Sequence, residues 1–325
     1  MQIVPTITEK SVNTKILYCN KSEKKTVKPF LKWAGGKSQL LHEIEKYYPF
    51  ADGNITKYAE PFVGGGAVLF DILNKYDLEK IYISDINEQL INTYHIICED
   101  IDALVEYLYT VQNDFFLLDT ADRKSYYMQK RERFNELNIN GDKNAVIEKA
   151  GLMIFLNKTC FNGLFRVNKK GLFNVPMGAY KNPLICDENN LRAVSKKLQE
   201  VTIVCGDYRE SLNFIDKNTF VYIDPPYRPI TDTANFTAYT KDFFNDKEQI
   251  KLAEFINKID KKGAKILVSN SDPKNFNIED DFFDNIYCAY KIKRVEANRM
   301  INCNSKARGK IKELLISNFY TQKYN

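Results

Sequence analysis

Short apolar runs alternate with segments of helical periodicity along much of this 325-residue chain. This alternation is typical of parallel strands joined by crossover helices. The apolar runs predict strands at residues 57–60, 80–84, 201–205, 220–223, 265–269, 286–295 and 312–318. Helical patterns cover residues 37–47, 67–75, 87–98 and 246–259. The sequence therefore predicts an α/β fold with helices packed on a mainly parallel sheet.

The alternation stops between residues 101 and 198. Helical patterns at 102–113, 121–137 and 143–157 precede a stretch rich in Gly, Asn and Lys. We expect residues 101–198 to form an inserted, mostly helical domain, and residues 28–100 and 199–325 to form the sheet domain. Residues 1–27 are polar and lack periodicity, which predicts a flexible N-terminal extension.

Composition excludes several classes of protein. A chain that is 44% hydrophobic and 27% charged is neither disordered nor fibrous. Because no apolar stretch approaches the ~18 residues of a membrane span and the polar start lacks a signal-peptide core, we expect a cytoplasmic protein without membrane contact. The seven cysteines are widely spaced and only two histidines occur, which predicts no disulfide framework and no bound metal.

Three consecutive glycines, Gly64 to Gly66, lie between a predicted strand and a predicted helix. Glycine permits a tight turn there and leaves helix N–H groups facing a ligand. Asp85 ends the next apolar run, at the position where an acidic residue commonly binds ribose hydroxyls. A structural turn followed by an ordinary strand-ending aspartate has the same pattern, so this segment alone leaves both interpretations open.

A second motif, Asp224-Pro-Pro-Tyr227, directly follows a predicted strand. The two prolines fix the backbone and remove two N–H donors. The Asp224 carboxylate and the proline carbonyls are then acceptors beside an aromatic ring, which suits a planar ligand that carries an NH2 group. A rigid turn with a surface tyrosine is the alternative, and the upstream glycine loop favours the binding site.

In their order these motifs resemble the Dam-type family of S-adenosylmethionine-dependent DNA adenine-N6 methyltransferases, over about residues 29–318. The matching segments are Phe30-Leu-Lys-Trp-Ala-Gly-Gly-Lys37, Glu60-Pro-Phe-Val-Gly-Gly-Gly66, Ser84-Asp-Ile-Asn87, Asn162-Gly-Leu-Phe-Arg-Val-Asn168 with Phe173-Asn-Val-Pro-Met-Gly178, and Asp224-Pro-Pro-Tyr227 with Asn235-Phe-Thr-Ala-Tyr239. The resemblance implies a Rossmann-like class I methyltransferase sheet. It also implies that residues 101–198 are a target-recognition domain with a β-hairpin.

The resemblance also implies roles for individual residues. For the S-adenosyl-L-methionine cofactor these are Trp33, Lys37, Glu60, Phe62, Gly64, Gly66, Asp85, Asp207 and Asp224. The catalytic residues are Asp224, Pro225, Pro226 and Tyr227. The residues expected to contact double-stranded DNA are Lys32, Phe161, Asn162, Leu164, Arg166, Lys169 and Pro176. For Asp207 the alternative is a solvated aspartate in a loop. For Phe161 the alternative is packing in the core, and for Asn162 it is formation of a turn.

The implied reaction is direct, in-line methylation of adenine N6, with GATC as the expected site and the base flipped out of the duplex. An RNA or protein amino-group methyltransferase, or a non-catalytic DNA-binding regulator of this fold, is the alternative. A cognate restriction endonuclease is a possible partner, and the oligomeric state is not determined. The sequence departs from the family pattern in the N-terminal extension and at Thr159-Cys160-Phe161.

The formal net charge of +5 conceals an uneven distribution. Residues 21–37, 151–186 and 291–312 carry +5, +5 and +7, so the rest of the chain carries −12. Because these three basic segments include motifs expected to face DNA, we predict that DNA binding depends steeply on salt.

Overall fold

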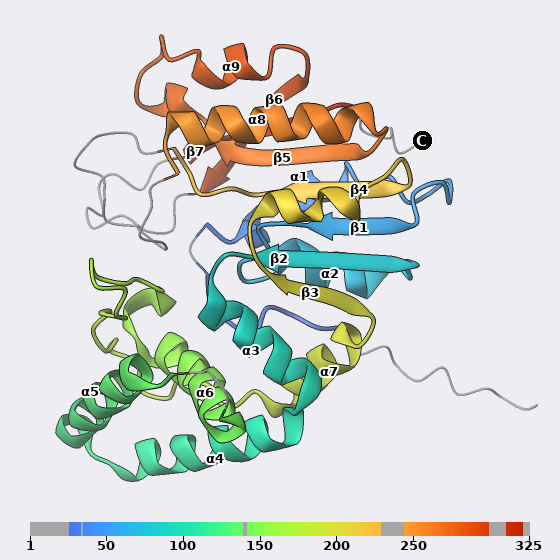
Figure 1. The fold of residues 1–325 in the computed structure, drawn as a ribbon. Coiled ribbons are helices and arrows are strands. Elements are labelled where there is room, and N and C mark those ends of the chain that lie inside the picture. Colours follow the sequence, from blue (N-terminus) through green and yellow to red (C-terminus); the bar gives the residue numbers. More distant parts are fainter. Residues whose placement is uncertain (1–25, 34, 139–141, 229–243, 299–309, 321–325) are drawn as a thin grey trace, which may run out of the picture.

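The structure is a computed structural model that describes residues 26–33, 35–138, 142–228, 244–298 and 310–320. Within these ranges seven strands form one sheet in the order β3-β2-β1-β4-β5-β7-β6 (Figure 1). The strands are β1 (Lys57–Glu60), β2 (Lys80–Asp85), β3 (Val201–Cys205), β4 (Thr219–Ile223), β5 (Lys265–Ser271), β6 (Lys291–Asn298) and β7 (Lys310–Ser317). The predicted Rossmann-like α/β sheet is confirmed.

The sheet has one point at which the strand order reverses, between β1 and β4. Neighbouring strands from β3 to β5 pair in parallel, whereas β7 pairs antiparallel with both β5 and β6. The carboxyl ends of β1 and β4 therefore lie side by side, and loops leave them in different directions. Ligands of open α/β sheets bind in the crevice at such a point.

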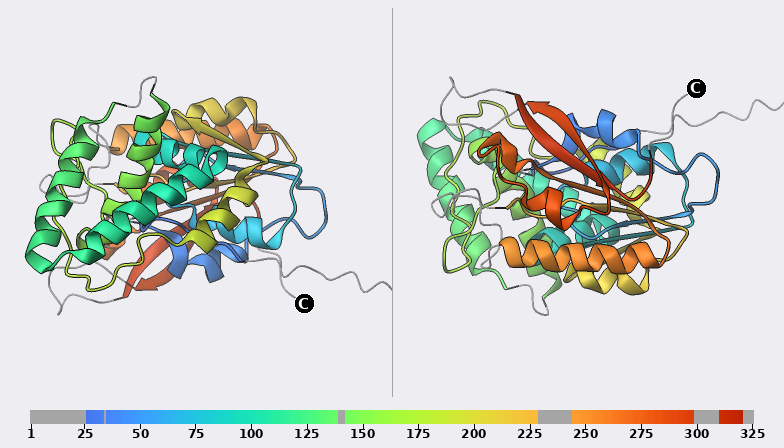
Figure 2. Two further views of the ribbon diagram at one scale, coloured as in Figure 1. Left: turned by 90° about the horizontal axis from the view of Figure 1, so that it is seen from below. Right: turned by 90° about the horizontal axis from the view of Figure 1, so that it is seen from above.

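Alternate residues of the strands face two separate cores, as the period of a strand requires. In β4, Phe220 and Tyr222 belong to one core, and Val221 and Ile223 to the other. The second core is covered by α8 (Asp246–Lys261) and α9 (Phe282–Ile286), and the first by η1 (Lys37–Gln39), α1 (Leu41–Glu45) and α2 (Ala67–Lys75). The two views of Figure 2 show these helices on opposite faces of the sheet.

In the described residues, five α-helices and the 3-10 helix η2 (Phe161–Gly163) lie between β2 and β3. The α-helices are α3 (Glu88–Glu99), α4 (Ile101–Leu117), α5 (Thr120–Glu136), α6 (Lys143–Thr159) and α7 (Glu188–Leu198). Helix α6 packs against α3, α4 and α5, and residues 150–156 are all buried, which explains their continuous apolar run. Helices α4 to α6 lie at the lower left of Figure 1, beside the sheet. The proposed division into separate domains stays a prediction.

The structure departs from the predicted elements in several places. The predicted strand at 286–295 is wrong at its start, because Tyr287 and the end of α9 pack into the core under α8 and β6 begins only at Lys291. The predicted helix at 37–47 is divided into η1 and α1. Helix α7 was not predicted. The predicted flexible extension of residues 1–27 is wrong at its last residue, because Val27 is buried and its N–H donates to Asn74 Oδ1.

Candidate active site

Asp224 lies directly after β4, at the point where the strand order reverses. Its carboxylate accepts a hydrogen bond from Ser269 Oγ at 2.9 Å, and its two oxygens lie 2.7 and 2.8 Å from Lys37 Nζ. Lys37 is buried, with 4% of its side chain exposed. Burial by itself lowers the pKa of this lysine, but its interactions with Asp224, Tyr227 and Glu313 outweigh the effect of burial and raise the pKa above its usual range.

The Tyr227 side chain lies beside this ion pair. Its hydroxyl accepts from Lys37 Nζ at 3.0 Å and donates to both carboxylate oxygens of Glu313, at 2.8 and 2.9 Å. The Lys37 ammonium also lies 4.9 Å from the centre of the Tyr227 ring. Burial raises the pKa of Tyr227, so its hydroxyl stays protonated at neutral pH. Asp224, Lys37, Tyr227 and Glu313 thus form one hydrogen-bonded cluster.

The two prolines of the motif differ in their surroundings. Pro225 is buried, whereas Pro226 is exposed and its carbonyl accepts from Gln249 Nε2 at 3.1 Å. Gln249 is fully buried on α8 and thereby ties the motif to that helix. The backbone after Asp224 is held both by proline geometry and by a side chain that comes from a different element.

The glycine loop packs closely against the Trp33 side chain. A Cβ atom at Gly64 would lie 2.8 Å from the Trp33 ring, and one at Gly65 would lie 2.9 Å from its Cβ. Gly64 has φ of +49°, and its N–H donates to Asp85 Oδ2 at 3.1 Å. The other Asp85 oxygen accepts from the N–H of Asn87 at 2.9 Å, and burial raises the pKa of the carboxyl group. This loop, Trp33 and Asp85 are therefore adjacent.

Glu60 and Phe62 lie at the end of β1, before the glycines. Glu60 is buried and accepts from the Tyr58 hydroxyl at 2.7 Å, and burial raises its pKa well above the ordinary value. Phe62 stacks on Tyr208 with ring centres 5.3 Å apart. The end of β1 and the loop that follows it thus carry a buried carboxyl group and an aromatic side chain close together in sequence.

Asp207 is already engaged within the protein. It caps η3 (Tyr208–Asn213) by accepting from the Arg209 N–H at 2.9 Å, and its carboxylate binds the Arg209 side chain at 2.6 and 2.9 Å. The bonds to Arg209 lower the pKa of this carboxyl group. The contact of Asp207 with a cofactor adenine stays a prediction.

The proposed recognition segment, residues 162–168 with 173–178, is joined to the backbone of Lys32. Asn157 at the end of α6 accepts from the Lys32 N–H at 2.8 Å and donates to the carbonyls of Lys32 and Gly163 at 2.8 and 2.9 Å. Asn162 adopts a left-handed conformation with φ of 56°, and 51% of the Phe161 side chain is exposed. Core packing of Phe161, the alternative interpretation, is therefore wrong, whereas turn formation by Asn162 is confirmed.

The predicted β-hairpin is not formed by strands: this segment has two isolated antiparallel bridges, Cys160 with Met177 and Val167 with Phe173. Arg166 Nε donates to Asn174 Oδ1 at 2.8 Å, which orients the guanidinium. Lys169 and Pro176 are exposed, and Leu164 is half-buried. Phe165 from this segment stacks on Trp33, with ring centres 5.5 Å apart. The segment is thus in contact with the glycine-loop region.

Sequence reasoning missed two residues of this site: Glu313, a member of the cluster, and Ser269, which donates to Asp224. The sequence carries no distinct signal for either residue, since Ser269 begins the polar run Ser269-Asn-Ser271 and Glu313 directly follows Lys312. Asn235 to Tyr239, which belong to the matched motif, and most of the basic stretch after Asn298 lie outside the described residues. Within the described part of the stretch, Arg294 binds Asp272 and Asp284, and Lys293 binds Glu43.

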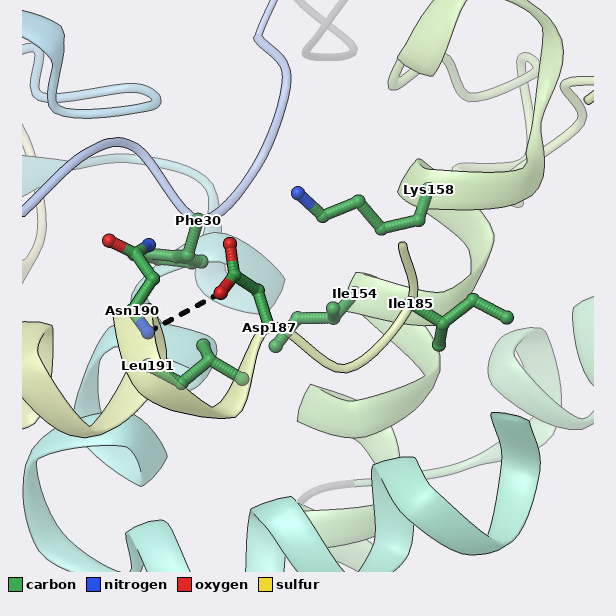
Figure 3. A pocket seen from close by; sticks show the side chains of 7 residues that line it. All are labelled: Phe30, Ile154, Lys158, Ile185, Asp187, Asn190 and Leu191. Atoms are coloured by element: carbon green, nitrogen blue, oxygen red, sulfur yellow. Dashed lines mark hydrogen bonds between the residues drawn. The ribbon is translucent and has the colours of Figure 1, made fainter. Parts of the chain in front are cut away.

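A small hollow between α6, α7 and the segment before Lys32 is distinct from the Asp224 cluster (Figure 3). It is lined by Phe30, Ile154, Lys158, Ile185, Asp187, Asn190 and Leu191. The Asn190 N–H donates to Asp187 Oδ1 at 3.4 Å. No group of three or more His, Cys, Asp or Glu side chains suited to a metal ion occurs among the described residues. In those same ranges no helix is long and apolar enough to cross a membrane.

Comparison with known proteins identifies the class. The family model of D12 class N6 adenine-specific DNA methyltransferases matches residues 33–301, and the chain belongs to this family. It is 51% identical over 296 residues to the type II methyltransferase M.MjaIII of Methanocaldococcus jannaschii, covering 90% of this chain and 99% of that protein.

Two further relatives also match over nearly their whole length. The chain is 38% identical to the DNA adenine methylase of Haemophilus influenzae, covering 89% of this chain and 92% of the relative. It is 34% identical to the type II methyltransferase M1.LlaDCHI of Lactococcus lactis subsp. cremoris, covering 90% of this chain and 96% of the relative. The protein is thus an adenine-specific DNA methyltransferase, and the alternatives of an RNA or protein amino-group methyltransferase and of a non-catalytic DNA-binding regulator are not supported.

Proposed function

We propose that this protein transfers a methyl group from S-adenosylmethionine to N6 of an adenine within GATC in double-stranded DNA, and that the adenine is flipped out of the helix. The observation that carries the proposal is the position of Asp224. Its carboxylate lies at the carboxyl end of β4, where the strand order reverses, with the Tyr227 ring beside it. A base inside a duplex cannot enter such a site, so it must leave the stack.

The amine of adenine is a weak nucleophile because its lone pair is delocalised into the ring. Hydrogen bonds from the NH2 group to the Asp224 carboxylate and the Pro225 carbonyl favour a pyramidal nitrogen and localise the lone pair. Because Ser269 and Lys37 already hold the carboxylate, its orientation is set before the base arrives. Tyr227 provides the surface on which the flipped base stacks.

The residues around the glycine loop suit the cofactor. S-adenosylmethionine, when bound, supplies an electrophilic methyl group. The Asp85 carboxylate accepts two backbone N–H bonds and retains lone pairs for ribose hydroxyls. The close approach of Trp33 to Gly64 and Gly65 leaves the loop without room for side chains. We propose that this site is formed by Trp33, Lys37, Glu60, Phe62, Gly64, Gly66, Asp85, Asp207 and Asp224.

Arg166 supports the proposed readout of DNA. An arginine side chain donates two bonds to O6 and N7 of guanine, and GATC contains one guanine on each strand. Asn174 holds the guanidinium at Nε, on a segment that carries exposed lysines at 169 and 170. We propose that these exposed lysines bind phosphates, which position a protein without specifying sequence. Lys32, Phe161, Asn162, Leu164 and Pro176 complete the proposed DNA-contacting set.

The deciding experiment maps methylated adenines on unmethylated duplex DNA incubated with the protein and S-adenosylmethionine. We expect N6-methyladenine at GATC sites, no product with Asp224→Ala, and little change in the DNA affinity of that variant. Methylation at other sequences would reject GATC alone, and wild-type turnover by Asp224→Ala would reject the mechanism. Tyr227→Ala is expected to impair capture of the flipped base, seen as weaker 2-aminopurine fluorescence at the target position.

A restriction endonuclease is the partner that the relatives suggest. Two of the relatives carry the name type II methyltransferase. We propose that methylation by this protein protects DNA from a nuclease of the same recognition sequence. Plasmid DNA modified by the protein should resist GATC-cleaving endonucleases that are blocked by adenine methylation, whereas plasmid treated with Asp224→Ala should be cut.

A further inference from the structure

Glu313 is joined to Asp224 by a continuous series of short contacts, although it belongs to none of the sequence motifs. Lys37 Nζ lies 2.7 Å from Asp224 Oδ1 and 3.0 Å from the Tyr227 hydroxyl. That hydroxyl donates to Glu313 Oε2 at 2.8 Å. The buried lysine is thus placed between two carboxylates, in direct contact with one and one hydroxyl group away from the other.

The antiparallel direction of β7 explains why a residue so late in the chain reaches the site. Because β7 runs opposite to β4 and β5, its first residues lie beside the carboxyl ends of those strands. Glu313 pairs there with Ser271, the last residue of β5. Strand alternation turns Glu313 to the same face as Leu315, which shares a core with Leu40, directly after η1. Only 7% of Glu313 is exposed.

A buried carboxylate is costly unless it is paired. Burial raises the pKa of Glu313, while the Lys37 charge and the Tyr227 hydrogen bond oppose that rise. The partners of Glu313 therefore come from the site itself. A role restricted to packing would have been served equally well by an apolar residue, as at Leu314 and Leu315.

The proposed reaction needs Asp224 to accept a hydrogen bond from the target amine. In this structure both Asp224 oxygens contact the Lys37 ammonium, and one also accepts from Ser269. Three of the four lone pairs of the carboxylate are therefore occupied, so the ammonium has to share Asp224 with the incoming amine. A buried ammonium that shares its carboxylate in this way is stabilised by a second anion nearby.

We propose that Glu313 is a positioning residue for methyl transfer: it fixes the Tyr227 hydroxyl and, through it, holds the Lys37 ammonium while Asp224 accepts the target amine. This inference rests on the proposed roles of Asp224 and Tyr227. Glu313 touches neither base nor cofactor in this scheme. It acts through two residues that do.

The test is a double-mutant cycle of Glu313→Gln and Tyr227→Phe in the full-length protein, measured as the single-turnover rate on GATC duplexes. Glutamine keeps the size and an acceptor oxygen but removes the charge, and phenylalanine keeps the ring but removes the hydroxyl. We expect each single variant to lose about tenfold in rate, and the double variant to lose little more, because both disrupt one interaction. The S-adenosylmethionine affinity of Glu313→Gln should change less than about twofold, which a general loss of structure would not allow.

A wild-type rate for Glu313→Gln, or a double variant whose loss is the product of the two single losses, would overturn the inference. Glu99→Gln is the matched control, since the Glu99 side chain on α3 is 66% exposed and its carboxylate lies 3.3 Å from His95 Nδ1, outside the Asp224 cluster. If the proposed function itself were wrong, the result would be distinguishable, because the wild-type protein would then yield no N6-methyladenine at all. Thermal unfolding of each variant separates a rate effect from misfolding.

Discussion

Lys37 Nζ lies 2.7 Å from Asp224 Oδ1, across 187 positions of sequence. The lysine comes from the glycine-containing segment before α1 and the aspartate from the loop after β4, so the contact joins the first and last motifs of the family pattern. The Lys37 side chain is 4% exposed and that of Asp224 is 19% exposed. Because little of either group is in contact with water, the two opposite charges stabilise each other within the protein.

Removing this lysine should destabilise the protein. Lys37→Met leaves Asp224 mostly buried without its cation, and we expect the free energy of unfolding to fall by about 2–4 kcal/mol. Lys293→Met is the matched control, because Lys293 binds Glu43 at 2.9 Å but is 47% exposed, and its loss should cost about 0–1 kcal/mol. Urea unfolding at pH 7 measures both. Equal losses in the two variants would contradict the prediction.

The glycine loop should tolerate no Cβ atom beside Trp33. Gly64→Ala combines a left-handed backbone with a 2.8 Å contact to the indole, so we expect a loss of about 3 kcal/mol in the free energy of unfolding, together with weaker cofactor binding. Gly53→Ala has a similar φ of +71° but no atom within 4 Å, and should cost only about 1–2 kcal/mol. Denaturant unfolding and calorimetric titration with S-adenosylmethionine measure the pair. Loss of affinity in Gly53→Ala as well would show that the effect is not local.

Glu60 should make stability depend on pH. Its pKa is raised well above 4.5 in the folded protein, mainly by burial. Below pH 4.5 the group is protonated in both states. As the pH rises from there towards the folded pKa, the unfolded chain ionises first, so the free energy of unfolding falls by up to about 1.4 kcal/mol per pH unit.

Glu60→Gln removes this titration, because its amide stays neutral. The difference in unfolding free energy between this variant and the wild type should therefore shift in favour of the variant as pH rises above 4.5. Urea unfolding of both proteins between pH 4.5 and 8 measures the difference. A difference that is independent of pH would show that the Glu60 pKa is not raised on folding.

Arg166 should discriminate the guanine of GATC. Arg166→Ala is expected to lose about 1–3 kcal/mol of preference for GATC over a site with that guanine replaced, as a ratio of kcat/KM values. Asn174→Ala should lose part of the same preference, because Asn174 Oδ1 accepts from Arg166 Nε at 2.8 Å and orients the guanidinium. If Arg166→Ala methylates both sites with the wild-type ratio, the guanine contact is assigned to the wrong residue.

The exposed lysines of the recognition segment should bind phosphates. Combined Lys169→Ala and Lys170→Ala changes are expected to make the plot of log affinity against log salt shallower by about 2, since each phosphate contact contributes about 0.9. Lys80→Ala is the control, because Lys80 is exposed at the amino end of β2, whereas Asp224 lies at the carboxyl end of the parallel strands. Titrations of a GATC duplex over a range of salt concentrations measure the slopes. An unchanged slope in the double variant would exclude these contacts.

Local patterns in the sequence were sufficient to predict the strands of the sheet and the motif after β4. A buried parallel strand is an uninterrupted apolar run, and a pair of prolines restricts the backbone wherever it occurs, so both features can be read from neighbouring residues. The same patterns were insufficient at residues 286–290. The apolar side chains there suit a strand, but they pack beneath α8 at the end of a short helix.

The cluster around Asp224 was decided by the tertiary structure. Lys37 and Asp224 are 187 positions apart, and Tyr227 and Glu313 are 86 apart, so no local pattern relates them. Glu313 reaches the site only because β7 lies antiparallel between β5 and β6, and Ser269 only because β5 pairs with β4. The sequence by itself determined which acid and which aromatic ring follow β4. The arrangement of the sheet decided which groups hold them, because hydrogen bonds depend on distance in space and not on separation along the chain.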